Sequence, residues 1–130
     1  MATPQRFQSG FKLQDGDTLN ATLGSPTWDN NYGVVALAGG GLTAATPVLL
    51  RGVNVVTTVA SGSDSVVLRK AIAGAVVLVR NATANAMQVF GNGSDTINGT
   101  AGATGISVAG NKSVLFFAGK DGVWFSLLTA

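Results

Sequence analysis

The sequence of 130 residues contains no histidine, no cysteine and no glutamate. Most enzyme sites at neutral pH use at least one of these side chains, because they titrate, attack substrates or coordinate metals where other groups do not. The absence of cysteine also excludes disulfide bonds and fits synthesis in a reducing cytoplasm. The composition therefore favours a structural or binding protein that is not an enzyme and needs no cofactor or metal.

Charged residues are also scarce, at 11% of the chain, against about 25% in an ordinary soluble domain. A free monomer of this size needs a surface with roughly 25–35% charged residues to stay dispersed. We therefore expect a surface rich in Ser, Thr, Asn and Gly, part of which is buried in a homo-oligomer. The net charge is only +2 and the eight basic residues are scattered along the chain, which argues against nucleic-acid binding.

No long hydrophobic segment indicates export or membrane insertion. The first residues are polar and lack the apolar core of a secretory signal. The longest run without charge, residues 30–50, contains three consecutive glycines at 39–41 and Pro47, which favours two strands and a turn over a membrane span. We expect a protein made in the cytoplasm that does not associate with membranes.

What the chain does contain is short β-branched and apolar segments separated by turn residues. We expect an N-terminal arm over residues 1–10 and a single β domain over residues 11–130. The predicted strands are residues 11–14, 18–23, 32–37, 47–60, 65–69, 75–81, 87–90, 96–97, 105–108, 113–117 and 123–128. Turn signals such as Asn98-Gly99 and Asp121-Gly122 recur about every 8–12 residues, which is typical of a sandwich or barrel. The predicted fold is therefore all-β, an antiparallel β-sandwich or barrel-like domain with Gly- and Asn-rich turns.

Several of these strands are apolar on both faces, notably those at residues 75–81, 113–117 and 123–128. A two-layer sandwich normally leaves one face of each sheet in water. Such strands either lie between two layers of the same chain or form a subunit interface. The low charge of the whole chain favours an oligomer.

Two stretches resemble one another: Ser61-Gly-Ser-Asp64 and Asn92-Gly-Ser-Asp95 each lie between apolar segments. They are consistent with two similar β units or with shared turn chemistry, which we favour. Their two carboxylates could also form an acid–base pair, although nothing in the sequence brings them together. Aspartate before Ser or Thr commonly caps a turn, and we favour that role here.

Other candidate sites have equally simple structural interpretations. Asp15, Asp17 and Asn20 offer oxygen ligands for Ca²⁺ but lack the full loop pattern, so a hairpin turn is favoured. The three glycines at 39–41 are not followed by the Lys-Ser/Thr of a phosphate loop. Five Asn-x-Ser/Thr sequons, at Asn20, Asn81, Asn92, Asn98 and Asn111, are better explained as turn residues than as glycosylation sites.

Four aromatic residues, Trp28, Tyr32, Trp124 and Phe125, are candidates for a platform that stacks on sugars. Aromatic side chains in β proteins more often belong to the core. Trp28 is the exception, because it lies in a polar, turn-rich segment. It could cover the core, stack on a ligand or contact another subunit, and we favour the last.

From Val48 to its end, the chain resembles small structural proteins of tailed bacteriophages. The resemblance rests on Gly52-Val-Asn-Val-Val-Thr-Thr-Val, Asp64-Ser-Val-Val-Leu, Ala73-Gly-Ala, the stretch 79–90, Asp95-Thr-Ile-Asn-Gly and Gly122-Val-Trp-Phe. Proteins of this kind decorate heads or form head fibres and tail fibres. No catalytic residues belong to the resemblance. It implies a virion protein, often a trimer on a local three-fold axis of the capsid.

These observations lead to one hypothesis with two rivals. The chain is expected to be a capsid decoration (cement) protein, a probable trimer that binds the major capsid protein on the outer head surface and stabilises the shell. The expected partner-binding residues are Arg6, Phe7, Trp28 and Tyr32. The rivals are a domain of a phage fibre or tail adhesin and a carbohydrate-binding module.

Overall fold

The computed structural model describes residues 28–38 and 46–129 and contains only strands and turns in these ranges. The predicted strands 11–14 and 18–23, the whole N-terminal arm at residues 1–10 and the three glycines at 39–41 lie outside the described residues. The strands are β1 Asn30–Val35, β2 Leu37–Ala38, β3 Val48–Leu49, β4 Val53–Thr58, β5 Asp64–Leu68, β6 Val76–Asn81, β7 Met87–Phe90, β8 Thr96–Ile97, β9 Thr100–Ala101, β10 Ile106–Val108, β11 Ser113–Lys120 and β12 Val123–Leu128. The expectation of an all-β protein is confirmed.

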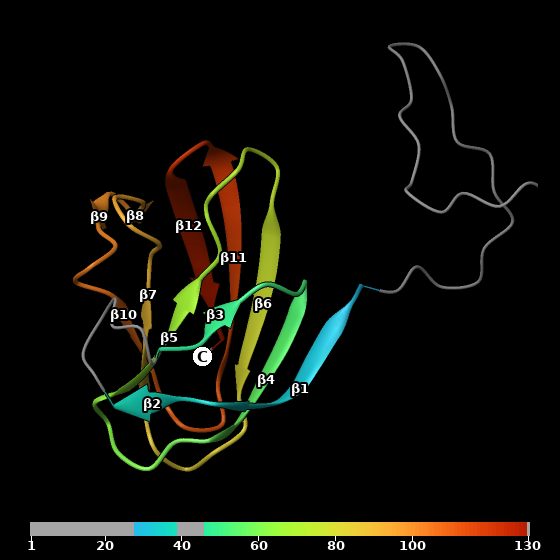
Figure 1. The fold of residues 1–130 in the computed structure, drawn as a ribbon, viewed down its shortest axis with the longest axis vertical. Helices are drawn as coiled ribbons and strands as arrows, with labels where there is room; N and C mark the ends of the chain where they lie inside the picture. Colours follow the sequence, from blue (N-terminus) through green and yellow to red (C-terminus); the bar gives the residue numbers. More distant parts are fainter. Residues whose placement is uncertain (1–27, 39–45, 130) are drawn as a thin grey trace, which may run out of the picture.

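The strands form two sheets that face one another across the core (Figure 1). The larger sheet has seven strands in the order β1-β4-β6-β11-β12-β8-β9. The smaller has the order β10-β7-β5-β2, with β3 paired to β5 beside β2. The chain passes repeatedly from one sheet to the other: β4 and β6 belong to the larger sheet, whereas β5 and β7 belong to the smaller one.

This winding makes many of the neighbouring strands parallel. Asn30 aligns with Val53 and Val53 with Leu78 in the larger sheet, and Ser65 aligns with Gln88 in the smaller one, all in parallel register. Partners are thus 23 to 25 residues apart, which is the length of one turn of chain around the two sheets. The fold resembles a β-solenoid, so the expected antiparallel sandwich or barrel is wrong. Antiparallel pairing is retained where β11 meets β6 and β12, and in the pairs β7–β10, β2–β5 and β8–β9.

Two of the expected strands are divided between the sheets. The segment predicted as one strand over residues 47–60 contains β3 in the smaller sheet and β4 in the larger one, separated by a bend at Arg51 and Gly52. The segment 32–37 likewise spans the end of β1 and the beginning of β2. Strand β9 was not predicted, although the Asn98-Gly99 turn before it was.

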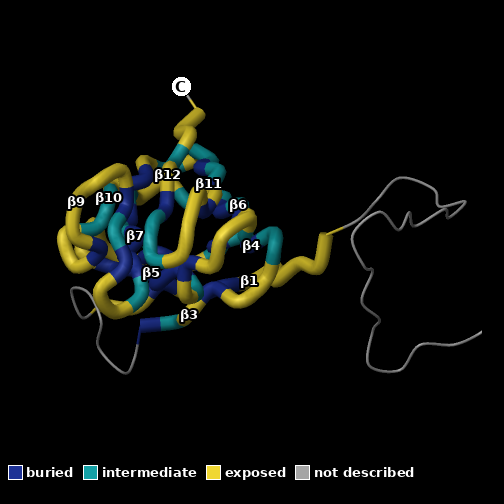
Figure 2. Tube along the Cα trace, turned by 90° about the horizontal axis from the view of Figure 1, so that it is seen from above, coloured by how far each residue is buried: buried dark blue, intermediate teal, exposed yellow. Residues whose placement is uncertain are grey.

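The core lies between the two sheets, where the tube in Figure 2 is buried along both layers. The larger sheet contributes Val56, Val77, Val79, Val114, Phe116 and Trp124, and the smaller contributes Leu49, Val66, Leu68, Met87, Val89 and Val108. Trp124 and Phe116 are the largest fully buried side chains. Their rings meet edge to face, with centroids 6.5 Å apart, an arrangement favoured by aromatic quadrupoles.

The predicted turn chemistry is confirmed at three positions. Asn98 and Gly99 both have positive φ in the hairpin between β8 and β9, where Ile97 pairs with Thr100, as a two-residue turn of this kind requires. Asn111 also has positive φ. The similar stretches before Asp64 and Asp95 adopt the same local turn, since each aspartate N–H donates to the carbonyl three residues earlier. Their spacing does not match the turn of the winding, so shared turn chemistry explains the similarity.

Candidate interaction surface

The outer face of the seven-stranded sheet is apolar across five adjacent strands. Side chains alternate along each strand, so those beside the buried core residues point away from it. On β1, β4, β6, β11 and β12 the apolar residues of this outer face are Tyr32, Val53, Val55, Val76, Leu78, Leu115, Phe117, Val123, Phe125 and Leu127. All of them are half-buried or exposed. We call this set the outer apolar face.

Cross-strand register places these side chains in rows. Leu115 aligns with Leu78 and Leu127, and Phe117 aligns with Val76 and Phe125. The rings of Phe117 and Phe125 stack, with centroids 5.6 Å apart and an interplanar angle of 27°. Both rings remain accessible, with exposures of 37% and 42%. Phe125 also lies against Gly119, where an added Cβ would come within 2.9 Å of the ring.

Among the described residues of these strands, two charged side chains share the outer face: Arg80, and Lys120, which is exposed and pairs with Val123. Arg80 is half-buried, and its guanidinium donates a hydrogen bond to the backbone carbonyl of Asn111. Ser113, which pairs with Arg80 across the sheet, and Thr57 on β4 add neutral polar groups. The face therefore carries little charge of either sign.

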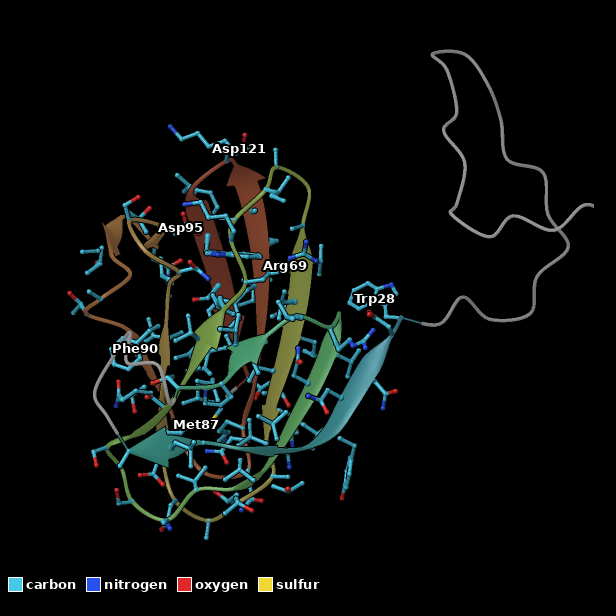
Figure 3. The ribbon with its side chains drawn as sticks, in the orientation of Figure 1. Trp28, Arg69, Met87, Phe90, Asp95 and Asp121 are labelled. Atoms are coloured by element: carbon cyan, nitrogen blue, oxygen red, sulfur yellow. The ribbon has the colours of Figure 1, made fainter. Side chains whose placement is uncertain are left out.

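Two of the four expected partner-binding residues lie in the described part of the chain. Tyr32 aligns with Val55 and is 75% exposed, so it belongs to the outer apolar face. Trp28 is 55% exposed and lies beside the start of β1 (Figure 3). Arg6 and Phe7 lie outside the described residues.

The segment that holds Trp28 is fixed by its neighbour Asp29. The Asp29 carboxylate accepts hydrogen bonds from the Gly52 N–H at 2.9 Å and from the Arg51 guanidinium at 3.2 Å. These two contacts, with the backbone N–H first, lower the pKa of Asp29 below its usual value. The entry into β1 is thereby tied to the bend before β4, which places Trp28 next to Gly52.

The proposed platform of four aromatic residues is wrong in its membership. Trp124 is fully buried and cannot reach a ligand, whereas Phe125 points to the opposite side of the same strand. The sequence suggested that both residues belong to the core, and the structure confirms this for Trp124 alone. Period-two alternation along β12 accounts for the difference.

The two aspartates considered as an acid–base pair have separate structural roles. Asp64 accepts hydrogen bonds from the N–H groups of Ala60 and Ser61 and from the Ser61 hydroxyl. These contacts, led by the Ala60 N–H, lower the pKa of Asp64. It thus caps its own turn, as the sequence predicted.

Asp95 instead joins distant segments. Its carboxylate is buried and accepts a hydrogen bond from the Ala71 N–H at 2.7 Å, and it forms an ion pair with Lys70. The carbonyl of Asp95 also accepts the Gly102 N–H. No hydrogen bond joins Asp95 to Asp64, so the structure gives no support to a carboxylate pair.

Within residues 28–38 and 46–129 there is no cluster of three or more potential metal-ligating Asp, Glu, His or Cys residues, and no pocket. The Ca²⁺ candidate Asp15, Asp17 and Asn20 lies outside these ranges. None of the described segments is a helix long and apolar enough to cross a membrane. No family model matches the chain, and no curated protein is significantly similar to it.

Sequence reasoning named Tyr32 and Phe125 as candidate site residues but missed the rest of the outer apolar face. The signal was present, because the strands at 75–81, 113–117 and 123–128 were recognised as apolar on both sides. What was missing was their order in the sheet. Only the pairing β6-β11-β12 turns three separate strands into one continuous surface.

Proposed function

We propose that this chain is a virion structural protein, a capsid decoration protein that binds the outer head surface of a tailed bacteriophage as a homo-oligomer, most simply a trimer. The observation that carries the homo-oligomer is the outer apolar face, which spans five strands and shares its surface with two charged side chains among the described residues, Arg80 and Lys120. Apolar patches on soluble proteins are often functional contact sites. The phage resemblance of residues 48–130 supports the choice of a virion.

The shape of the surface fits contact with another protein chain better than binding and reaction of a small molecule. An exposed sheet face offers broad contact area, whereas small-molecule sites are concave and mostly enclosed. A decoration protein gains occupancy from several modest contacts made at once, because the second and third contacts are intramolecular after the first. A symmetric oligomer on a symmetric shell meets this requirement.

The proposal is tested with heads of a phage that encodes the chain, prepared without it by gene deletion. Purified protein should cosediment with these heads and saturate at a fixed number of copies per capsid protein. Heads that already carry the protein serve as the matched control and should take up none. Occupied heads should also release their DNA at a higher temperature than bare heads. Absence of cosedimentation, or recovery of the protein only with tails, contradicts a role in head decoration.

A carbohydrate-binding module is the second candidate, because Trp28 and Tyr32 are both exposed near the start of β1. Exposed aromatic rings of this kind supply an apolar body with a polar edge. A glycan array probed with the parent protein and with Trp28→Ala separates the two candidates. Binding that disappears in the variant would favour the module, and a blank array would favour assembly alone.

A further inference from the structure

We infer that the outer apolar face is covered by other copies of this chain and forms the inner wall of a homo-oligomer. In a trimer the three faces turn toward the three-fold axis. The inference rests on the proposed homo-oligomer and identifies the surface through which its copies contact one another. Its tests use the isolated protein without capsids, so that it and the decoration role can fail separately.

The charge of the face fits a second copy. A copy of the same face brings no acidic group and two basic ones, Arg80 and Lys120, and Arg80 is already hydrogen-bonded to the Asn111 carbonyl. The two lie at opposite ends of the face: Arg80 pairs with Ser113 at the start of β11, and Lys120 is at the end of β11, three residues or about 10 Å beyond Phe117. The centre of the face, around the stacked Phe117 and Phe125, is therefore apolar, and the two charges lie at the rim, as in ordinary interfaces.

The extent of the face is enough for the apolar centre of a contact. Five strands at a spacing of about 4.8 Å and about five residues at roughly 3.3 Å each give a patch of about 400 Å², the size of the largest apolar patch on a typical soluble protein, which is often functional. A stable interface buries about 800 Å² per partner, so the surrounding polar rim supplies the rest. Sheet faces pack well on one another at about 10 Å when apolar side chains interdigitate. Rows such as Leu78, Leu115 and Leu127 supply the necessary ridges.

A copy of the chain fits better than the capsid as the occupant. Interfaces between permanent subunits are more apolar than those between partners that also exist apart. A decoration protein must remain dispersed before it meets a head, and with 11% charged residues this chain has little means to do so. Copies of the chain can cover the face from the time of synthesis, whereas a capsid covers it only after attachment.

The first test substitutes residues of the outer apolar face and measures the mass of the assembly by sedimentation. The parent should sediment as a multiple of 13.0 kDa, with three copies expected. The double variant Phe125→Lys/Leu127→Lys should sediment as a single copy, because it places like charges at the centre of the contact, while its far-UV circular dichroism should match the parent. Val48→Lys is the matched control, since Val48 is an exposed apolar residue (46%) on the smaller sheet, and it should keep the parent's mass. A monomeric parent at micromolar concentration, or a double variant with the parent's mass, overturns the inference.

The second test does not depend on how the double variant folds. Because the chain has no cysteine, single substitutions provide unambiguous reporters. Leu127→Cys should react with a maleimide at least tenfold more slowly than Val48→Cys at high protein concentration, although Leu127 is the more exposed of the two in a single copy (62%). Dilution below the dissociation concentration should remove the difference. Equal reaction rates at all concentrations would mean that the face stays open to solvent, and would overturn the inference.

Discussion

Replacing Trp124 should strongly destabilise the protein, and the structure allows the cost to be divided. Its side chain is fully buried and contacts the ring of Phe116 edge to face. Removing a buried aromatic side chain to leave alanine costs about 3–5 kcal/mol, of which the ring pair accounts for roughly 0.5–1.5 kcal/mol. We expect Trp124→Ala to lower the free energy of unfolding by about 3–5 kcal/mol, a large part of the stability of an ordinary domain.

Trp124→Phe should be much milder for a specific reason. The Trp124 Nε1–H is buried without a hydrogen-bond partner, and an unsatisfied buried donor costs about 1–3 kcal/mol. Both substitutions remove that donor, but phenylalanine alone keeps a ring to meet Phe116, and it leaves a smaller cavity than alanine does. The loss on Trp124→Phe should therefore be about 1–2 kcal/mol, well below that of Trp124→Ala.

The assay is urea unfolding followed by far-UV circular dichroism, because the substitution removes a fluorophore. With a slope of about 2 kcal/mol per molar urea, the alanine variant should shift the midpoint by roughly 2 M. All variants are compared at one chain concentration, since assembly makes stability depend on it. Trp28→Ala is the control and should shift the midpoint little, because Trp28 is exposed. If Trp124→Phe is as damaging as Trp124→Ala, the retained ring gains nothing from its contact with Phe116. If Trp124→Ala leaves the midpoint unchanged, Trp124 is not in the core.

Gly102→Ala should destabilise the protein far more than Gly62→Ala, because an added Cβ at Gly102 would lie 2.3 Å from the Asp95 carbonyl oxygen, whereas one at Gly62 would meet nothing within 4 Å. Thermal melts compare the two variants. Equal melting temperatures would show that the backbone at Gly102 can move aside. Asp64→Asn should lower the urea midpoint at pH 6. The difference between the urea midpoints of the variant and the parent should become smaller as the pH falls below the ordinary aspartate pKa of 3.8. A carboxylate with a lowered pKa contributes stability above that value and loses it as the pH falls through its folded pKa, so a gap constant from pH 6 to pH 3 would contradict this role. Deleting residues 2–10 should leave the melting temperature nearly unchanged and weaken binding to bare heads, and equal occupancy at limiting concentration would exclude the arm from attachment.

Local features of this fold were readable from the sequence because they depend on short-range chemistry. The Asn98-Gly99 hairpin, the turn capped by Asp64 and the strand at 87–90 follow from φ preferences, side-chain capping and β-branched runs. The burial of Trp124 was also expected. These features need no knowledge of which strands are neighbours.

The winding of the chain around the two sheets could not be predicted from such local patterns. Parallel partners such as Val53 and Leu78 carry no turn signal between them, because an intervening strand crosses to the opposite sheet. No sequence repeat marks the 23- to 25-residue turn, so alternation and turn spacing favoured the commoner antiparallel sandwich. The outer apolar face was missed for the same reason, because the sequence does not show which strands are neighbours. Each apolar strand was recognised alone, but the face exists only once β6, β11 and β12 are placed side by side.

The position of β11 between β6 and β12 has a consequence for how the chain acquires its structure during synthesis. Strands β1, β4 and β6 leave the ribosome well before β11 and β12, and domains normally fold as units when their last segment is available. The two largest core side chains, Phe116 and Trp124, belong to those late strands. A nascent chain that ends before them has a sheet whose β6 edge is unpaired and a core without its aromatic centre. Closure of the core is therefore expected only after β11 and β12 have been synthesised and can pair. Its rate should be limited by the pairing of distant strands, which typically places folding in milliseconds to seconds.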